Sequence, residues 1–399
     1  MPRNYKLVLG FVALFVLNVS DAHADLLADI VQSMPENSWT RINQNQFSEV
    51  WTPSPQRPTS WSPGTNITGT SGAAWGGGKL WIYGGNIGQE FGNEVYAFDA
   101  SSLTWQRLSL PSETLGDGYS EADAIPVDGL WNVPRSGESW DNLVYLNNMA
   151  RFAVIDTSFN GAGFKTGPFL YDPAKADPNK VGGTDGSQVN PSVYFDVVGG
   201  HMWENRDFTQ STSPVGAVSA YANIGGTDVV YYSNGGRNYD LWEWVPSPLG
   251  DTWTKIGVRN GAAASDAKPG AGAFAPSRNL FVRKSAKKLI YWDVSIGGVA
   301  QVTIPTVNGS GTWPVDQSWG MDYDTVHDVF YLWNGRRELW MLKAPDDLVS
   351  GTWVATQLSP GGDAPDFNAS ILGKWIYMPE YGAFIGVADM DGNVYVYKP

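Results

Sequence analysis

Two stretches of the chain place a tryptophan beside carboxylates. "SGESWD" (residues 136–141) ends in Trp140 and Asp141, and "SWGMDYD" (residues 318–324) contains Trp319 and Asp322. Small-molecule sites combine aromatic surfaces with a few polar groups, and this pairing suits a sugar, whose ring stacks on an aromatic face. These four residues are therefore candidate ligand-binding residues, although core packing is the commoner use of a tryptophan.

Two further clusters place an arginine next to an asparagine. Asn205 and Arg206 lie in "HMWENRD" (residues 201–207), and Arg237 and Asn238 lie in "GGRNYD" (residues 235–240). The first cluster has an alternative interpretation as an edge strand whose Arg–Asp pair discourages pairing with other sheets. The second has an alternative as a solvated turn. If these residues are functional, we expect them at the rim of a ligand site.

Residues for metal or cofactor chemistry are scarce. The chain has no cysteine, and beyond residue 24 its histidines are His201 and His327, so a site of three histidines cannot form. "WGGGK" (residues 75–79) lacks the following helix of a phosphate-binding loop. "DMDGN" (residues 389–393) lacks the spacing to a bidentate glutamate that a calcium loop requires, and it is typical of a hairpin. We therefore expect no metal and no cofactor.

The elements that would position these residues recur along the chain. Short strand-like segments contain a tryptophan at Trp39, Trp105, Trp203, Trp253 and Trp353. From Trp105 onward the steps are 98, 50 and 100 residues, and a strand near residue 302 falls midway in the last step. An aromatic segment and an apolar segment precede each of these strands except the one at Trp39, as in residues 93–99 and 79–85. Four short strands repeated every 40 to 50 residues predict an all-β fold, a β-propeller of four-stranded antiparallel blades.

The repeats resemble those of kelch-type propellers, within the galactose-oxidase-like superfamily. In that family a Gly-Gly pair ends the second strand, a tyrosine lies in the third and a tryptophan in the fourth. Gly84, Gly85, Tyr96 and Trp105 match this pattern, while Gly235, Gly236 and Trp253 match it in part. The resemblance covers residues 38–399 and bears on fold more than on function. The copper-radical site of galactose oxidase requires a cysteine, so the absence of cysteine excludes that activity.

The spacing favours six blades, with seven as the alternative if residues 106–202 contain two. The segment "NVYVYKP" (residues 393–399) reads as the third strand of the last blade, with no fourth strand after it. We predict that residues 38–43, around Trp39, supply the missing strand and close the ring. Residues 44–70, 110–137 and 173–200 are expected to be long loops or insertions.

The first 24 residues have the features of a secretory signal. Arg3 and Lys6 precede an apolar run (residues 7–19), and "AHA" (residues 22–24) fits the cleavage rule. Cleavage after Ala24 would release residues 25–399 as one propeller domain, secreted or periplasmic, from a bacterium. The formal charge of −14 argues against nucleic acid and anionic membranes as partners. We expect no membrane insertion and a monomeric protein.

Two hypotheses for function remain open. In the first, the protein is an exported, non-enzymatic binding module that recognises a glycan or a protein on one face of the propeller. In the second, it is a carbohydrate-active hydrolase or lyase that uses carboxylates at the central channel. The first is favoured because the sequence contains no recognisable catalytic constellation. The second requires two carboxylates facing one pocket, free of arginine or lysine partners.

Overall fold

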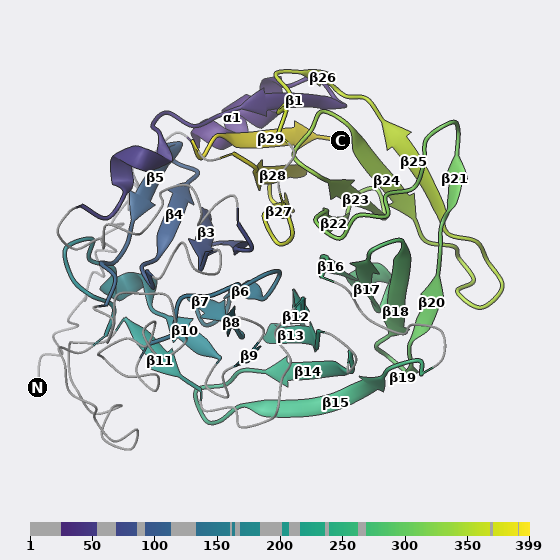
Figure 1. Cartoon of the computed structure of the whole chain (residues 1–399), viewed down its shortest axis with the longest axis horizontal. Helices are drawn as coiled ribbons and strands as arrows, with labels where there is room; N and C mark the ends of the chain where they lie inside the picture. The colour runs from purple at the N-terminus through teal and green to yellow at the C-terminus, as the bar shows by residue number, and fades with distance from the viewer. Residues whose placement is uncertain are drawn as a thin grey trace, which may run out of the picture.

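The computed structural model describes residues 25–53, 69–85, 92–112, 133–159, 162–163, 168–183, 202–206, 216–235, 239–261, 269–367, 370–389 and 391–399. These residues form a ring of six antiparallel blades around a central axis (Figure 1). The predicted all-β propeller with six blades is therefore confirmed. Among the described residues, the stretch that begins after Trp105 and ends with the strand containing Trp203 forms one blade, not two.

Each blade starts with a strand next to the axis and continues outward. Blade 1 consists of β2 (Gly72–Gly76), β3 (Lys79–Tyr83), β4 (Tyr96–Asp99) and β5 (Thr104–Arg107). Blade 2 consists of β6 (Leu143–Leu146), β7 (Arg151–Val154), β10 (Phe169–Tyr171) and β11 (Trp203–Asn205). Blade 3 consists of β12 (Val218–Ile224), β13 (Thr227–Ser233), β14 (Leu241–Val245) and β15 (Thr252–Val258).

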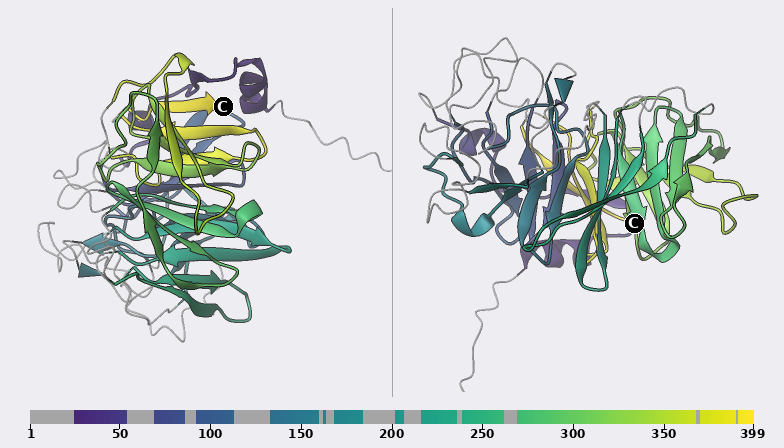
Figure 2. Two further views of the ribbon diagram at one scale, coloured as in Figure 1. Left: turned by 90° about the vertical axis from the view of Figure 1, so that its right-hand side faces the viewer. Right: turned by 90° about the horizontal axis from the view of Figure 1, so that it is seen from below.

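The second half of the ring repeats this order. Blade 4 consists of β16 (Gly272–Ala275), β17 (Leu280–Ser285), β18 (Lys288–Asp293) and β20 (Gln301–Thr303). Blade 5 consists of β22 (Gly320–Asp324), β23 (Val329–Trp333), β24 (Leu339–Lys343) and β25 (Val354–Leu358). Blade 6 consists of β27 (Trp375–Met378), β28 (Ala383–Val387), β29 (Val394–Lys398) and β1 (Ser38–Arg41). Side views show many of these strands running across the thickness of the ring (Figure 2).

Short elements lie outside this plan. β19 (Gly298–Val299), β21 (Thr306–Asn308) and β26 (Gly361–Gly362) add parallel pairings to the outer strands of blades 3, 5 and 6. β8 (Ser158–Phe159) and β9 (Ala162–Gly163) form a small hairpin. The predicted long loops lie partly within the described residues and contain the 3₁₀ turns η1 (Phe47–Val50) and η2 (Pro173–Lys175). A third such turn, η3 (Pro276–Arg278), joins β16 to β17.

The middle strands are buried on both faces because every blade is covered by its two neighbours. All five residues of β23, "VFYLW", are buried, so this strand shows no polar alternation.

The glycine pair after β3, Gly84 and Gly85, is required by the local backbone geometry. Gly84 has a φ of +84°, and a Cβ there would lie 2.5 Å from the carbonyl oxygen of Gly137. The N–H of Gly85 donates to that same oxygen at 3.1 Å.

The two ends of the chain meet in blade 6. β1 pairs antiparallel with β29, with Trp39 opposite Tyr397, so the predicted closing strand is present (Figure 1). The ring of Trp39 lies 5.3 Å from that of Trp333 and 5.5 Å from that of Trp375. Because β1 covers the free edge of β29, this closure removes an unpaired sheet edge.

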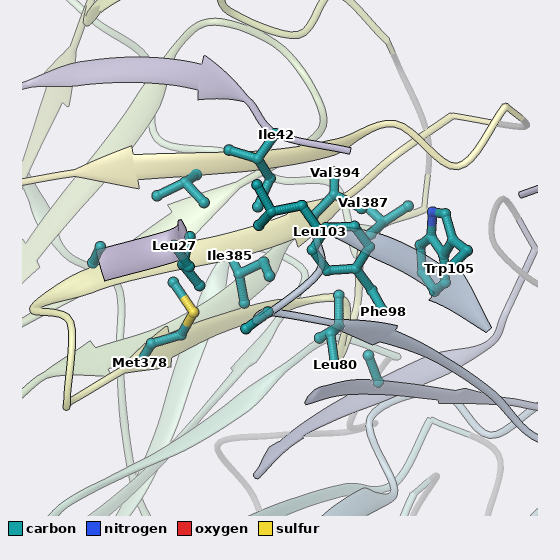
Figure 3. Packing of buried hydrophobic residues seen from close by; sticks show 14 of the residues in the cluster. Leu27, Ile42, Leu80, Phe98, Leu103, Trp105, Met378, Ile385, Val387 and Val394 are labelled. Atoms are coloured by element: carbon teal, nitrogen blue, oxygen red, sulfur yellow. The ribbon is translucent and has the colours of Figure 1, made fainter. Parts of the chain in front are cut away.

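A short helix strengthens the closure. α1 (Leu26–Ser33) begins at Asp25, whose Oδ1 accepts the N–H of Ala28 at 3.1 Å. It buries Leu27 and Val31 in the cluster between blades 6 and 1 (Figure 3). The ammonium group of Lys398 donates to the carbonyl oxygens of Val31 and Met34 at the other end of the helix, at 3.0 and 2.9 Å. Among the described residues, no helix is long and apolar enough to cross a membrane.

Candidate functional site: a cavity on the ring axis

A cavity of about 420 Å³ lies on the ring axis and is lined by residues from all six blades. This volume falls within the range of small-molecule sites, about 300–1,000 Å³. Its mouth is at the end of the ring where the six innermost strands finish. Lining residues at or just beyond those strand ends are Gly77, Asn147, Asn223, Pro276, Thr325 and Pro379.

Asp141 lines the cavity at the opposite end, before the first strand of blade 2. Its main-chain oxygen accepts from the N–H of Ser219 in blade 3 at 2.7 Å, and its Oδ2 accepts from the N–H of Gly272 in blade 4 at 2.6 Å. Its Oδ1 lies beside Gly373, just before the innermost strand of blade 6. Asp141 therefore reaches across the axis from blade 2 and forms the floor of the cavity.

The Asp141 carboxyl is mostly buried, with 8% of the residue exposed. Its pKa is raised to about 8, mainly by burial and also by the nearby Asp322 carboxylate, whereas the N–H of Gly272 and the charges of Arg283 and Lys374 oppose this shift. A proton is therefore present on this carboxyl through much of the neutral pH range.

Asp322 is the second carboxylate of the cavity. It lies in β22, and its two oxygens accept backbone N–H groups of Tyr323 at 2.8 Å and Tyr377 at 2.7 Å. The second bond joins blade 5 to blade 6. Burial raises the pKa of Asp322 to about 7, although both N–H groups favour the ionised form. Two carboxyls with raised pKa thus share one cavity, which is a feature of functional sites.

An aromatic residue occupies the same position in five of the six innermost strands. In the hairpin that each of these strands forms with the second strand of its blade, this position is the second pair from the turn. The residues are Trp75, Tyr145, Phe274, Tyr323 and Tyr377, and all five line the cavity. In blade 3, Asn223 has this position and Tyr221 lines the wall two residues earlier. The wall is therefore aromatic around the axis.

The charged lining of the cavity is acidic. Asp141, Asp322 and Glu380 line it, and its lining contains no lysine, arginine or histidine among the described residues. Glu380 is exposed at the mouth, where its Oε1 accepts the indole N–H of Trp75 at 2.8 Å. No group of three or more metal-binding side chains occurs in the described part of the chain.

Two buried cations lie near the floor without lining the cavity. The Lys374 ammonium donates to the carbonyl oxygen of Ser71 at 2.8 Å, and burial lowers its pKa to about 7. The Arg283 guanidinium donates to the main-chain oxygens of Asn234 at 2.7 Å and Gly216 at 2.6 Å. Burial lowers its pKa to about 10. Both cations are thus held by main-chain oxygens of the scaffold.

The sequence-based candidates are distributed over separate parts of the ring. Asp141 and Asp322 both line the cavity, in agreement with their predicted place near the axis. Trp140 has a φ of +50° and donates its N–H to the carbonyl oxygen of Thr70 at 2.7 Å. Trp319 is 8% exposed and packs in the cluster between blades 4 and 5. Neither tryptophan is among the residues that line the cavity.

The second pair of candidates lies at the outer edge of blade 2. Asn205 ends β11 and is buried, and Arg206 follows it. The Arg206 guanidinium donates to Asp251 of blade 3 at 2.5 and 3.2 Å and to the Ser247 carbonyl oxygen at 2.5 Å. It joins two blades, and neither residue lines the cavity. Arg237 and Asn238 lie outside the described residues.

The sequence reasoning missed the aromatic wall, the asparagines at the mouth and Glu380. The signal was an aromatic residue near the end of five of the six first strands, as in "AAWG" (residues 73–76), "LVYL" (residues 143–146) and "WIYM" (residues 375–378). It becomes visible only when the first strands are aligned by their hairpin turns.

Gly373 provides a test of the packing at the floor. A Cβ at this position would lie 2.5 Å from Oδ1 of Asp141, so Gly373→Ala must displace the carboxyl. We expect a loss of about 1–3 kcal/mol in the free energy of unfolding, measured by denaturant titration. Gly261→Ala, where a Cβ meets nothing within 4 Å, is the matched control. Equal stability of the two variants would contradict the close packing around Asp141.

Comparison of the sequence with known proteins does not identify a family for this chain. A scan against family models finds no match to this chain, and a search of curated proteins finds no significant relative. The six-bladed ring and its axial cavity are therefore the features that point to a function.

Proposed function

We propose that the protein is an exported, kelch-like propeller that acts as a binding module and takes a glycan into the axial cavity. The observation that carries the proposal is the set of aromatic residues at equivalent positions of five blades, which line the cavity together with the carboxyls of Asp141 and Asp322. Aromatic faces provide stacking surfaces for sugar rings, while carboxyl and amide groups bind hydroxyls. A volume of about 420 Å³ suits a small part of a glycan better than a protein surface.

The proposed export rests on the signal features before Ala24. Asp25, the residue after the predicted cleavage site, is the N-cap of α1. Cleavage there would leave the closing helix and strand intact. The proposed kelch relationship rests on Gly84, Gly85, Tyr96 and Trp105, which lie at the positions that the family pattern expects.

A glycan array followed by calorimetry tests the binding function. We expect at least one glycan to bind the wild-type protein, and Trp75→Ala to weaken that binding roughly tenfold, because one stacking surface is lost. Trp75 is partly exposed at the mouth, so its truncation should leave the fold intact. The control is Phe367→Ala, since Phe367 is exposed and does not line the cavity. Equal effects of the two substitutions would exclude the cavity as the site.

The enzyme alternative keeps one specific observation in its favour. Asp141 and Asp322 line the same cavity, and neither forms an ion pair with a lysine or arginine among the described residues. A carboxyl with a raised pKa can act as a general acid in glycoside cleavage. Incubation of the bound glycan with the protein, followed by mass spectrometry, separates the two functions. If the wild-type protein forms a cleavage product and Asp322→Asn does not, the protein is a hydrolase or lyase and the binding-module proposal is wrong.

A further inference from the structure

The cavity has an electrostatic character that narrows the ligand class. Its charged lining groups are three carboxyls, and the described lining residues contain no cationic side chain. A buried carboxylate without a cationic partner is unfavourable, and this cost is what raises the pKa of Asp141 and Asp322. A ligand with a positive charge would remove part of that cost, whereas an anionic ligand would increase it.

The buried cations of the scaffold do not fill this role. Lys374 and Arg283 influence Asp141 through space, but both are committed to main-chain oxygens away from the cavity lining. The floor carboxyl of Asp141 uses Oδ2 for Gly272, while its Oδ1 faces Gly373, another lining residue. Asp141 therefore presents its carboxyl to the cavity at the end opposite the mouth, where a donor on the ligand can bind.

The aromatic wall points to the same class. Trp75, Tyr145, Phe274, Tyr323 and Tyr377 line the cavity from five blades; Trp75 is partly exposed, and the other four are mostly buried between blades. The face of an aromatic ring carries negative potential, so a cation near several rings is stabilised without an ion pair. A cavity lined by carboxyls and aromatic rings is the arrangement that binds protonated or quaternary amines.

We propose that the group entering this cavity is a protonated amine, so that the glycan is one that carries free amino groups. This inference rests on the proposed glycan-binding function and adds the charge of the ligand. An N-acetylated sugar of the same size offers no charge to Asp141 and Asp322. A uronic acid or sulfated sugar is repelled by them.

Calorimetry with two matched trisaccharides tests the inference. The probes are the glucosamine trimer, with free amines, and the N-acetylglucosamine trimer, which is neutral. At pH 7 we expect the free-amine trimer to bind at least tenfold more tightly. Asp322→Asn should remove most of this difference, and Asp366→Asn, an exposed carboxylate outside the cavity, should preserve it. Equal or tighter binding of the neutral trimer would overturn the inference.

Asp322→Asn can also perturb the fold, because an amide can accept only one of the two N–H groups that Asp322 now binds. Glu380→Gln provides a second variant at the exposed mouth, where no such constraint applies. We expect it to weaken binding of the free-amine trimer roughly threefold and to leave binding of the neutral trimer unchanged. An unchanged preference in both folded variants would also overturn the inference.

The pH dependence of binding is measured with tetramethylammonium, because the charge of this ion does not change with pH. The groups that act on Asp141 are the N–H of Gly272 and the charged groups of Asp322, Arg283 and Lys374. The groups that face Asp322 are the N–H groups of Tyr323 and Tyr377. Since the pKa values of the two carboxyls are about 8 and 7, affinity should rise roughly tenfold from pH 6 to pH 8.5 as they ionise. Binding of this ion without binding of either trisaccharide would refute the glycan function and keep the amine site. If neither tetramethylammonium nor the glucosamine trimer binds, the amine site is refuted.

Discussion

Removal of residues 25–43 should lower the melting temperature by at least about 10 °C, or prevent folding. This segment contains α1 and β1, which together supply the fourth strand of blade 6 and part of the cluster between blades 6 and 1. Without β1, the edge of β29 is unpaired and Trp39 no longer fills the space beside Trp333 and Trp375. Thermal unfolding followed by circular dichroism measures the effect.

A point substitution separates closure from chain length. Trp39→Ala should cost about 3–5 kcal/mol in the free energy of unfolding, because Trp39 is 1% exposed and its indole N–H donates to the Arg337 carbonyl oxygen at 3.1 Å. Arg41→Ala in the same strand is the control, since Arg41 is exposed. An unchanged melting temperature of the shortened chain would refute closure of the ring by this strand.

Arg283→Met should have an effect of similar size, about 3–5 kcal/mol in the free energy of unfolding. Arg283 lies in β17 of blade 4 and is 0% exposed. It donates to Ser233 Oγ at 3.0 Å and to the carbonyl oxygens of Asn234 and Gly216, all in blade 3. Its removal leaves buried main-chain oxygens without these donors, which carries most of the cost.

The control for this substitution is Arg336→Met, because Arg336 is exposed in a turn. Guanidinium unfolding of both variants gives the comparison. Arg283→Met should also raise the pKa of Asp141, because the Arg283 guanidinium charge favours the ionised Asp141 carboxylate in the wild-type protein. A loss below about 1 kcal/mol would show that Arg283 does not hold blades 3 and 4 together.

Much of the ring could be predicted because each blade repeats a local pattern. A tryptophan occurs in or directly before the fourth strand of five of the six blades, and one of the five is Trp39, where the first three strands do not precede it in the chain. Strands and hairpin turns can be recognised because each is encoded by residues that are close together in the sequence. The closing strand followed from the same pattern, because a blade with three strands leaves an edge that needs a partner.

The cavity could be predicted only in part because its residues come from six separate strands. Trp140 and Trp319 look alike in sequence, since each precedes a carboxylate, but both lie before their strands and neither reaches the cavity lining. Asp141 also precedes its strand, and it reaches the axis through bonds to blades 3 and 4. Arg206 finds its carboxylate in Asp251, 45 residues away in the next blade. Such pairings depend on how neighbouring blades pack.

The structure of the protein in complex with a glycan from the array is the most direct test of the proposed site. We predict that a sugar unit lies in the axial cavity, with an amino group next to Asp141 or Asp322 and a ring face against Trp75 or Tyr377. A glycan bound at the outer edge of the blades, for instance near Arg206, with the cavity empty, would contradict this account.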